Sequence, residues 1–371
     1  MAKDAAKKSS TKVSKVLIQE NAYQFLKDYI NNPSPVGFES SGQKIWLNYM
    51  KKYVDTTFTD PYGTAVGVIN PEHPFKVVIE AHCDEIAWII THIESDGMIR
   101  VKRHGGSDNM IAPSKTVMIH THNGQKLRGL FGWPAIHTRD EYTSMGYKQE
   151  ELWVDMGLKD KDDVIAAGVE IGNLITFDTQ LEEIGDYYVG RSLDNKIGGY
   201  IIAEALREIS EKNINLPYDL YVVNSVQEEV GLHGATMIAK KLQADLALVH
   251  DVCHNTNTPK IDKAKDGDNV GGKGPCLEYT AQNHRSINKM LREVAKESKI
   301  PVQLTVGSMG NDTMAFFMEN TPTAILATPL KYMHTTVEMA HKKDVKYAIK
   351  LYVEFLKALT PDKINSINKN I

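Results

Sequence analysis

Short apolar runs alternate with amphipathic stretches along most of the chain. Each apolar run is bounded by turn or charged residues, which is typical of strands buried on both faces. These runs are at residues 65–69, 75–81, 218–226, 245–249 and 324–327. Apolar residues recur at helical spacing at residues 16–30, 41–53, 197–209, 234–242 and 286–295. Strands that alternate with helices predict an α/β fold whose sheet has parallel strands at its centre.

The stretch 88–177 has a different pattern. It is a series of short β-rich pieces separated by turn sequences, interrupted by one short helical segment at 159–167. We therefore predict an all-β domain over residues 88–177, inserted into an α/β domain formed by residues 16–87 and 178–371. Residues 1–15 are predicted to be a flexible tail, basic through the following lysines: Lys3, Lys7, Lys8, Lys12 and Lys15.

The composition limits the kinds of molecule that the protein is expected to bind. Hydrophobic residues make up 42% of the 371 residues and charged residues 24%, as in an ordinary globular protein. The formal net charge of −4 gives no sign of the excess positive charge that is typical of nucleic-acid-binding proteins. No apolar run approaches the ~20 residues of a membrane helix. Three cysteines, Cys83, Cys253 and Cys276, are too few for a disulfide framework, so the expected location is the cytoplasm. We expect neither nucleic acid nor a membrane as a partner.

Acidic residues and histidines stand where several predicted strands end. They are His82, Asp84, Glu228, Glu229 and Asp251, with His334 after a predicted loop at 328–332 and Asp194 at the start of a predicted helix. Open α/β sheets bind ligands at the carboxyl ends of their strands. Two histidines with several carboxylates suit a divalent ion such as zinc, cobalt or manganese.

Spacing suggests separate tasks for these residues. His82 and Asp84 face the same side of an extended chain, so the carboxylate can orient the imidazole. Glu228 and Glu229 are adjacent and diverge, so that one can bind metal and the other can act as a general base. Each residue also has a purely structural interpretation. A histidine can be hydrogen-bonded within the core or at the surface, and a glutamate pair can lie on a solvated face. Asp194 can be the N-cap of a helix. The spacing alone leaves a metal site and a structural role both open.

The ordered motifs resemble a known enzyme family. They are Ala81-His82-Cys83-Asp84-Glu85-Ile86, Leu193-Asp194-Asn195-Lys196, Glu228-Glu229-Val230-Gly231-Leu232-His233-Gly234-Ala235, Asp251-Val252 and His334-Thr335. As a set they resemble the dinuclear-metal aminopeptidases of the MH clan, in the branch of the tetrahedral, deblocking and glutamyl aminopeptidases. The resemblance covers nearly the whole chain.

This resemblance implies a role for each site residue. His82 and Asp251 would bind one of two divalent ions, zinc or cobalt in the first place and manganese as an alternative. Glu229 and His334 would bind the other ion, and Asp194 would bridge both. The catalytic residues would be Glu228, as general base and then acid, and Asp84, which orients His82. The resemblance also implies a cis peptide bond between Asp194 and Asn195.

The implied fold is an α/β mixed sheet with helices on both faces, of the zinc-exopeptidase type, interrupted by an inserted all-β dimerisation domain. The implied assembly is a homo-oligomer with a dimer as its building block, and a dodecamer in relatives. Several positions depart from the family pattern: Cys83, Ala87, His233, the segment Gly310-Asn311-Asp312-Thr313, and Met333 with Thr335-Thr336 around the last histidine. None of them removes a ligand, so a changed substrate is the expected consequence.

The predicted function is a metal-dependent aminopeptidase that removes N-terminal residues from short peptides. An N-acyl amino-acid or peptide deacylase of the same clan is an alternative with the same chemistry. A glucanase-like glycoside hydrolase is a second one, although two carboxylates suffice for that reaction without the histidines. A non-catalytic scaffold is a third. No charge in the segment 307–313 distinguishes an acidic, basic or apolar first residue.

Overall fold

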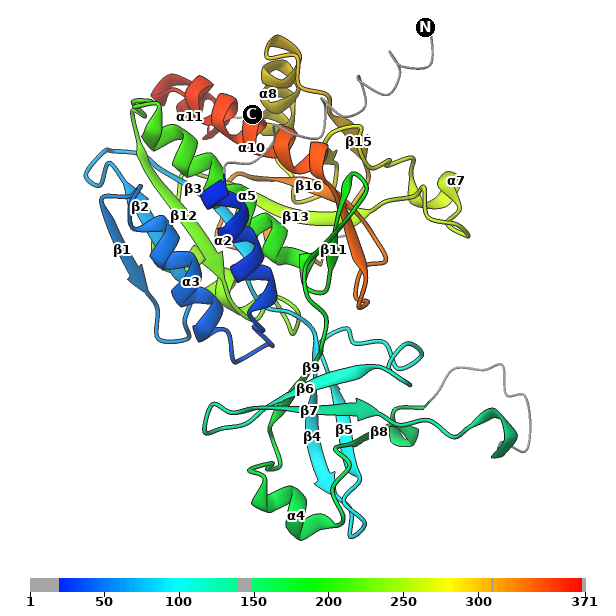
Figure 1. The fold of residues 1–371 in the computed structure, drawn as a ribbon. Helices are drawn as coiled ribbons and strands as arrows, with labels where there is room; N and C mark the ends of the chain where they lie inside the picture. Colours follow the sequence, from blue (N-terminus) through cyan, green and yellow to red (C-terminus); the bar gives the residue numbers. More distant parts are fainter. Residues whose placement is uncertain (1–19, 139–147, 308–309, 369–371) are drawn as a thin grey trace, which may run out of the picture.

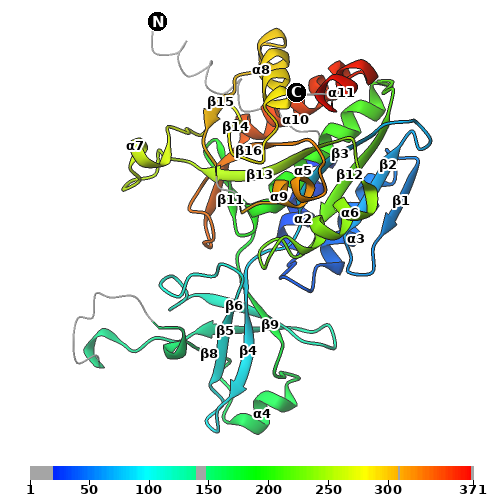
Figure 2. The same cartoon turned by 180° about the vertical axis from the view of Figure 1, so that it is seen from behind.

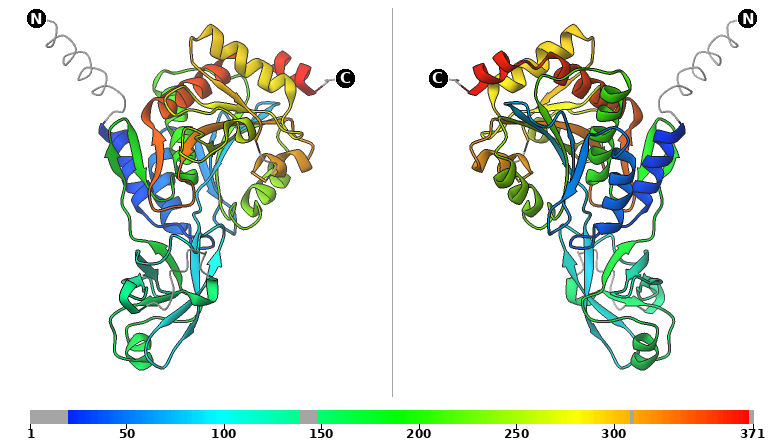
Figure 3. Two further views of the ribbon diagram at one scale, coloured as in Figure 1. Left: turned by 90° about the vertical axis from the view of Figure 1, so that its right-hand side faces the viewer. Right: turned by 90° about the vertical axis from the view of Figure 1, so that its left-hand side faces the viewer.

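The computed structural model describes residues 20–138, 148–307 and 310–368. The predicted basic tail and the first four residues of the predicted helix 16–30 lie outside this part of the chain. Two units are visible in Figure 1: a large α/β unit and a β-barrel below it. The side views show that the barrel extends from one end of the sheet, so the molecule is elongated (Figure 3).

The α/β unit is built on one mixed sheet. Its strand order is β1 (Thr56–Thr59), β2 (Ala65–Ile69), β12 (Asp219–Ser225), β3 (Lys76–His82), β13 (Leu246–His254), β16 (Thr323–Lys331), β17 (Glu338–His341), β11 (Tyr187–Gly190) and β10 (Glu182–Ile184). A branch adds β14 (Cys276–Glu278) and β15 (Gln303–Thr305) beside β16. Strands β12, β3, β13 and β16 run parallel to one another, which confirms the predicted parallel centre.

Helices cover both faces of the sheet. One face carries α2 (Glu20–Asn31), α3 (Ser40–Met50), α5 (Leu193–Glu211), α8 (Arg285–Glu297), α10 (Lys342–Ala358) and α11 (Pro361–Asn368). The other face carries α6 (His233–Leu242) and α9 (Thr313–Met318), seen from behind in Figure 2. Alternation along β3 explains the two layers, because Ile79 packs on the first face and Val78 on the second. A short helix, α7 (Lys263–Asp266), follows β13.

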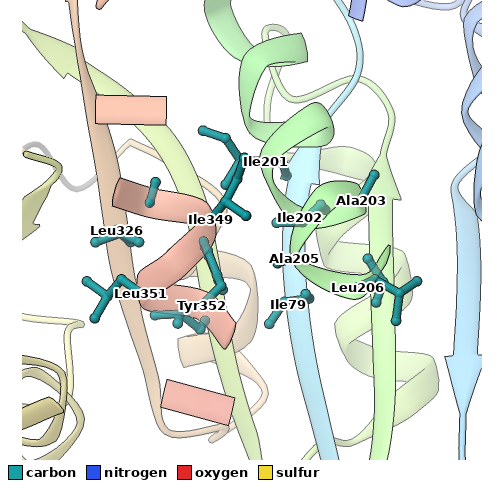
Figure 4. Packing of buried hydrophobic residues seen from close by; sticks show 14 of the residues in the cluster. Ile79, Ile201, Ile202, Ala203, Ala205, Leu206, Leu326, Ile349, Leu351 and Tyr352 are labelled. Carbon is teal, nitrogen blue, oxygen red and sulfur yellow. The ribbon is translucent and has the colours of Figure 1, made fainter. Parts of the chain in front are cut away.

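The largest core lies between the sheet and α5. Figure 4 shows Ile201, Ala205 and Leu206 of α5 packed near Ile79 of β3, with Tyr352 of α10 beside them. All of these side chains are fully buried. The position of α5 between the sheet and other helices explains why most of its residues are buried.

The barrel is a closed sheet with its own core. Its strands, in order, are β4 (Ala87–Ile93), β5 (Ile99–His104), β8 (Trp153–Asp155), β7 (Lys126–Phe131), β6 (Thr116–His120) and β9 (Leu174–Phe177). Its short helices are η1 (Ile136–Thr138), η2 (Gln149–Glu151) and α4 (Lys161–Ala166), the last of which lies within the predicted helical segment 159–167. Trp88 packs edge-on against Phe131 and Phe177 inside the barrel. A separate apolar core makes this unit self-contained.

Two strands are longer than predicted. β13 does not end before His250 but continues to His254, and β16 extends through the predicted loop 328–332 as far as Lys331. The two strands pair with each other along this extension, from Ala247 opposite Thr323 to His254 opposite Leu330. That pairing provides hydrogen-bond partners for the backbone N–H and C=O groups of residues whose local sequence does not predict a strand. Among the described residues, no helix is long and apolar enough to cross a bilayer.

The α5 core predicts a stability effect. Leu206→Ala leaves a cavity at a fully buried site, so the free energy of unfolding should fall by about 2–5 kcal/mol. Leu304→Ala is the matched control, since Leu304 is 50% exposed, and it should change the value by less than about 0.5 kcal/mol. Urea unfolding followed by circular dichroism measures both. Equal losses in the two variants would contradict the packing described.

Candidate metal centre

All seven predicted site residues meet at one edge of the sheet. His82 ends β3, and Asp84 follows it. Glu228 and Glu229 lie in the turn between β12 and α6, and Asp251 lies on β13. Asp194 is at the start of α5, and His334 is in the loop between β16 and β17. The carboxyl ends of parallel strands meet at this edge, as the sequence predicted.

The side chains form two groups that could each hold a metal ion. One group is His82, Glu228 and Asp251, and the other is Asp194, Glu229 and His334. Within each group one potential ligand atom per residue lies within 4.8 Å of the others.

Asp194 joins the two groups. Its Oδ1 lies 3.3 Å from Nε2 of His82, and its Oδ2 lies 3.2 Å from Nε2 of His334. His334 Nε2 is also 3.2 Å from Oε1 of Glu229. His82 Nε2 is 3.8 Å from the nearest carboxylate oxygens of both Glu228 and Asp251. The carboxylate of Asp194 therefore presents one oxygen to each histidine.

Asp84 is fully buried and contacts three other residues of the site. Its Oδ1 lies 3.5 Å from Nδ1 of His82. Its two oxygens also accept hydrogen bonds from the backbone N–H groups of Glu228, at 3.0 Å, and Glu229, at 3.1 Å. One carboxylate thus positions a histidine and the turn that carries both glutamates.

The backbone around the site has unusual geometry. The Asp194–Asn195 peptide bond is cis, which confirms the expectation from the resemblance. The turn after Glu229 contains Gly231 with φ +134°, a value that favours glycine. His334 itself has a φ of 61°, and Glu338 anchors it by accepting its backbone N–H at 2.8 Å.

Sequence reasoning missed three buried carboxylates near the centre. Glu338 accepts the backbone N–H groups of both Asp194, at 3.1 Å, and His334. Glu80 and Asp312 both accept from the hydroxyl of Ser225. Glu338 is four residues from His334, but that spacing is not a recognisable motif. Glu80 and Asp312 are brought together only by the fold.

The electrostatics of the centre favour cations. Burial raises the pKa of Glu228 to about 10, and the neighbouring carboxylates Asp312 and Asp251 add to the shift. Burial likewise raises the pKa values of Asp251 and Glu229. For His334, burial lowers the pKa, but its hydrogen bonds to Asp194 and Glu229 outweigh this and raise it to about 11. Imidazole nitrogens and carboxylate oxygens are ligands that zinc and similar divalent ions bind. A bound cation would stabilise the ionised form of these buried carboxylates, so the donor set fits divalent metal ions.

A cavity of about 550 Å³ opens from this centre. Its walls include His254, Asp266, Asn269, Glu278, Thr305, Gly307, Gly310, Asn311 and Met333. His254 lines this cavity, whereas His284 lines a different cavity. Asn311, one of the departures from the family pattern, lies in the cavity wall.

Comparison with known proteins identifies the family of the chain. Residues 63–351 match the model of the M42 glutamyl aminopeptidase family. The chain belongs to this family. Family members are metal-dependent, and membership makes this M42 protein a peptidase hydrolase with aminopeptidase activity.

Individual relatives cover nearly the whole M42 chain. A lysyl aminopeptidase of Pyrococcus furiosus is 29% identical over 91% of this chain and 98% of its own. The TET aminopeptidase of a marine sediment archaeon, Thaumarchaeota archaeon SCGC AB-539-E09, superposes with a TM-score of 0.88 at 25% identity, covering 94% and 99% of the two chains. The dodecameric PhTET1-12s has a TM-score of 0.78 at 25% identity, over 89% of this chain and 97% of its own.

The clustered charges predict how stability depends on pH in chelator-treated protein. Folding raises the pKa of Glu228 from 4.5 to about 10 and that of His334 from 6.5 to about 11. Both groups then bind more protons when folded, so stability is lost as the pH rises through this range. Between pH 6.5 and 9 the free energy of unfolding should fall as the pH rises, by about 1.4 kcal/mol per pH unit for each of the two groups.

Denaturant titrations at several pH values measure this slope. Protein loaded with zinc should have a flatter or reversed slope, because metal binding requires deprotonated ligands. Chelated protein whose stability rises with pH over this range would contradict the charge arrangement described.

Proposed function

We propose that the chain is a dinuclear metal aminopeptidase that removes N-terminal residues from short peptides. His82 and Asp251 would hold one ion, Glu229 and His334 the other, and Asp194 would contribute to both. The supporting observation is that Asp194 presents one carboxylate oxygen to each of the two histidines, at 3.3 and 3.2 Å. Zinc or cobalt is the proposed metal, with manganese as an alternative.

When bound, the ions would supply Lewis-acid activation of water and of the scissile carbonyl. Glu228 is the proposed general base. It lies beside His82, and cations bound in the centre would favour its ionised form, which could accept a proton from the attacking water. The same carboxyl group would then donate that proton to the leaving amine. Asp84 would keep both His82 and Glu228 in position.

The proposed assembly is a homo-oligomer built from dimers, located in the cytoplasm. A relative with the same fold, PhTET1-12s, forms a dodecamer. The barrel, proposed as the dimerisation domain over residues 88–177, exposes the large apolar side chains Met110, Leu130, Ile136 and Ile171. We propose that some of these side chains lie in the contact between the two chains of a dimer. The three cysteines are free and buried, as suits a reducing compartment.

Sedimentation velocity tests this assembly. We expect the protein to sediment as a species much larger than one 41.5 kDa chain. Replacing Leu130 and Ile136 together with aspartate should shift it toward smaller species by introducing charge into the contact. A wild-type protein that sediments as a monomer at micromolar concentration would contradict the proposal.

Glu228→Gln tests the catalytic assignment. The amide cannot accept the proton, so kcat should fall by about 10²–10⁴-fold on peptides with a free N-terminus. The variant should still bind metal, as measured by mass spectrometry of the dialysed protein. Glu293→Gln, an exposed change of the same charge on α8, is the control and should keep wild-type activity.

A substrate panel separates the aminopeptidase from its alternatives. Chelator-sensitive cleavage of free N-termini supports the proposal. Cleavage of N-acylated substrates alone would indicate a deacylase, and chelator-insensitive cleavage of glucan would indicate a glycoside hydrolase. Bound metal without turnover of any substrate would contradict the proposed activity.

A further inference from the structure

One acidic side chain in the cavity has no task in the proposed reaction. Glu278 is the last residue of β14 and is only 4% exposed, yet it lines the cavity. Within the described part of the chain, no hydrogen bond or ion pair is made by its carboxylate. Burial raises the pKa of Glu278 to about 7, and no neighbouring base offsets this effect. A buried carboxylate without a cation is costly, so its presence at a cavity wall indicates a cationic ligand.

Sheet register places Glu278 beside the metal centre. Ala327 of β16 pairs with Asp251 on one side and with Cys276 on the other. Paired residues point to the same face, and Glu278 is two residues beyond Cys276 on the same strand. With strands spaced about 4.8 Å apart, the Cα of Glu278 is on the order of 12 Å from that of Asp251. A long side chain on the first residue of a peptide held at the metal centre can extend toward this position.

The cavity around Glu278 offers hydrogen-bond acceptors, and its described lining contains no lysine or arginine. Asn269, which is 2% exposed, uses its amide N–H on Thr305, and its Oδ1 has no hydrogen-bond partner in the described structure. Gly307 leaves room for the carboxylate, because a Cβ there would lie 1.7 Å from Oε2 of Glu278. Among the described lining residues there is no lysine or arginine. An acidic substrate side chain beside Glu278 would therefore have no lysine or arginine of the described lining to pair with.

The charges that line the cavity also favour a cationic ligand. Two divalent ions would match the charge of the carboxylates of Asp194, Glu228, Glu229 and Asp251. The cavity wall carries two further carboxylates, that of the buried Glu278 and that of Asp266, which is exposed on α7. Excess charge in a concave, partly dry site attracts ligands of the opposite sign.

We propose that Glu278 selects substrates whose N-terminal residue has a basic side chain, lysine or arginine, by pairing with its cation at the end of the cavity. The inference rests on the proposed aminopeptidase function and adds the class of first residue. Asn269 Oδ1 would accept a second hydrogen bond from the same ammonium or guanidinium group. Asp266 would contribute long-range attraction only, because it is exposed.

Lysine and norleucine p-nitroanilides test this on the wild-type protein, because the two side chains have the same carbon chain and differ in the ammonium group. We expect kcat/KM to be higher for lysine by at least about 30-fold, as for a buried charge pair. Glu278→Gln should remove most of this ratio while the norleucine substrate is still cleaved. Gly307→Ala, which displaces the carboxylate, should reduce the same ratio. Glu293→Gln, outside the cavity, should leave it at the wild-type value.

The outcomes separate this inference from the function on which it rests. Chelator-sensitive cleavage of norleucine as fast as lysine would overturn the selectivity and leave the aminopeptidase standing. Equal losses on both substrates in Glu278→Gln, with folding verified by circular dichroism, would also overturn it, because Glu278 would then bind the shared α-amino group. No cleavage of any free N-terminus by metal-loaded wild type would overturn the proposed function and this inference together.

Discussion

The structure depends on a concentration of negative charge at one edge of a sheet. Five carboxylates converge there because three parallel strands end, and α5 begins, at the same place. They are Asp84, Asp194, Glu228, Glu229 and Asp251. Burial, and to a smaller extent the neighbouring carboxylates, raises the pKa values of Glu228, Glu229 and Asp251. The two histidines offset only part of this charge. The edge is stable in its ionised form only when cations complete it.

The surrounding fold holds this charge in place. The α5 core keeps the start of that helix, and so Asp194, against the sheet. Asp84 and Glu338 are buried carboxylates that accept backbone N–H groups, and each positions two separate parts of the site. A rigid frame of this kind limits how far the ligands can relax away from one another, which preserves the affinity for metal at some cost in stability of the metal-free chain.

Much of the site could be predicted because its residues follow local patterns. Strand ends are visible in the sequence as apolar runs, and these runs alone locate His82, Glu228 and Glu229 at one edge of the sheet. Asp251 and His334 were placed correctly despite wrong strand limits, since the extra length of β13 and β16 comes from their pairing with each other. Long-range pairing of this kind leaves no periodic signal in either strand.

The residues that were missed have no local signature. Glu338, Asp312 and Glu278 are single acidic residues in unremarkable surroundings along the chain, and only packing buries them near the centre. The substrate cavity could not be inferred for the same reason. Its walls come from α7, β14, β15 and the loop before α9, which are far apart in sequence.

Anomalous diffraction from crystals grown with zinc would locate the metal ions. We expect two peaks per chain, one near His82 and Asp251 and one near His334 and Glu229, with Asp194 contacting both. A single peak, or peaks that do not involve Asp194, would contradict the proposed dinuclear centre.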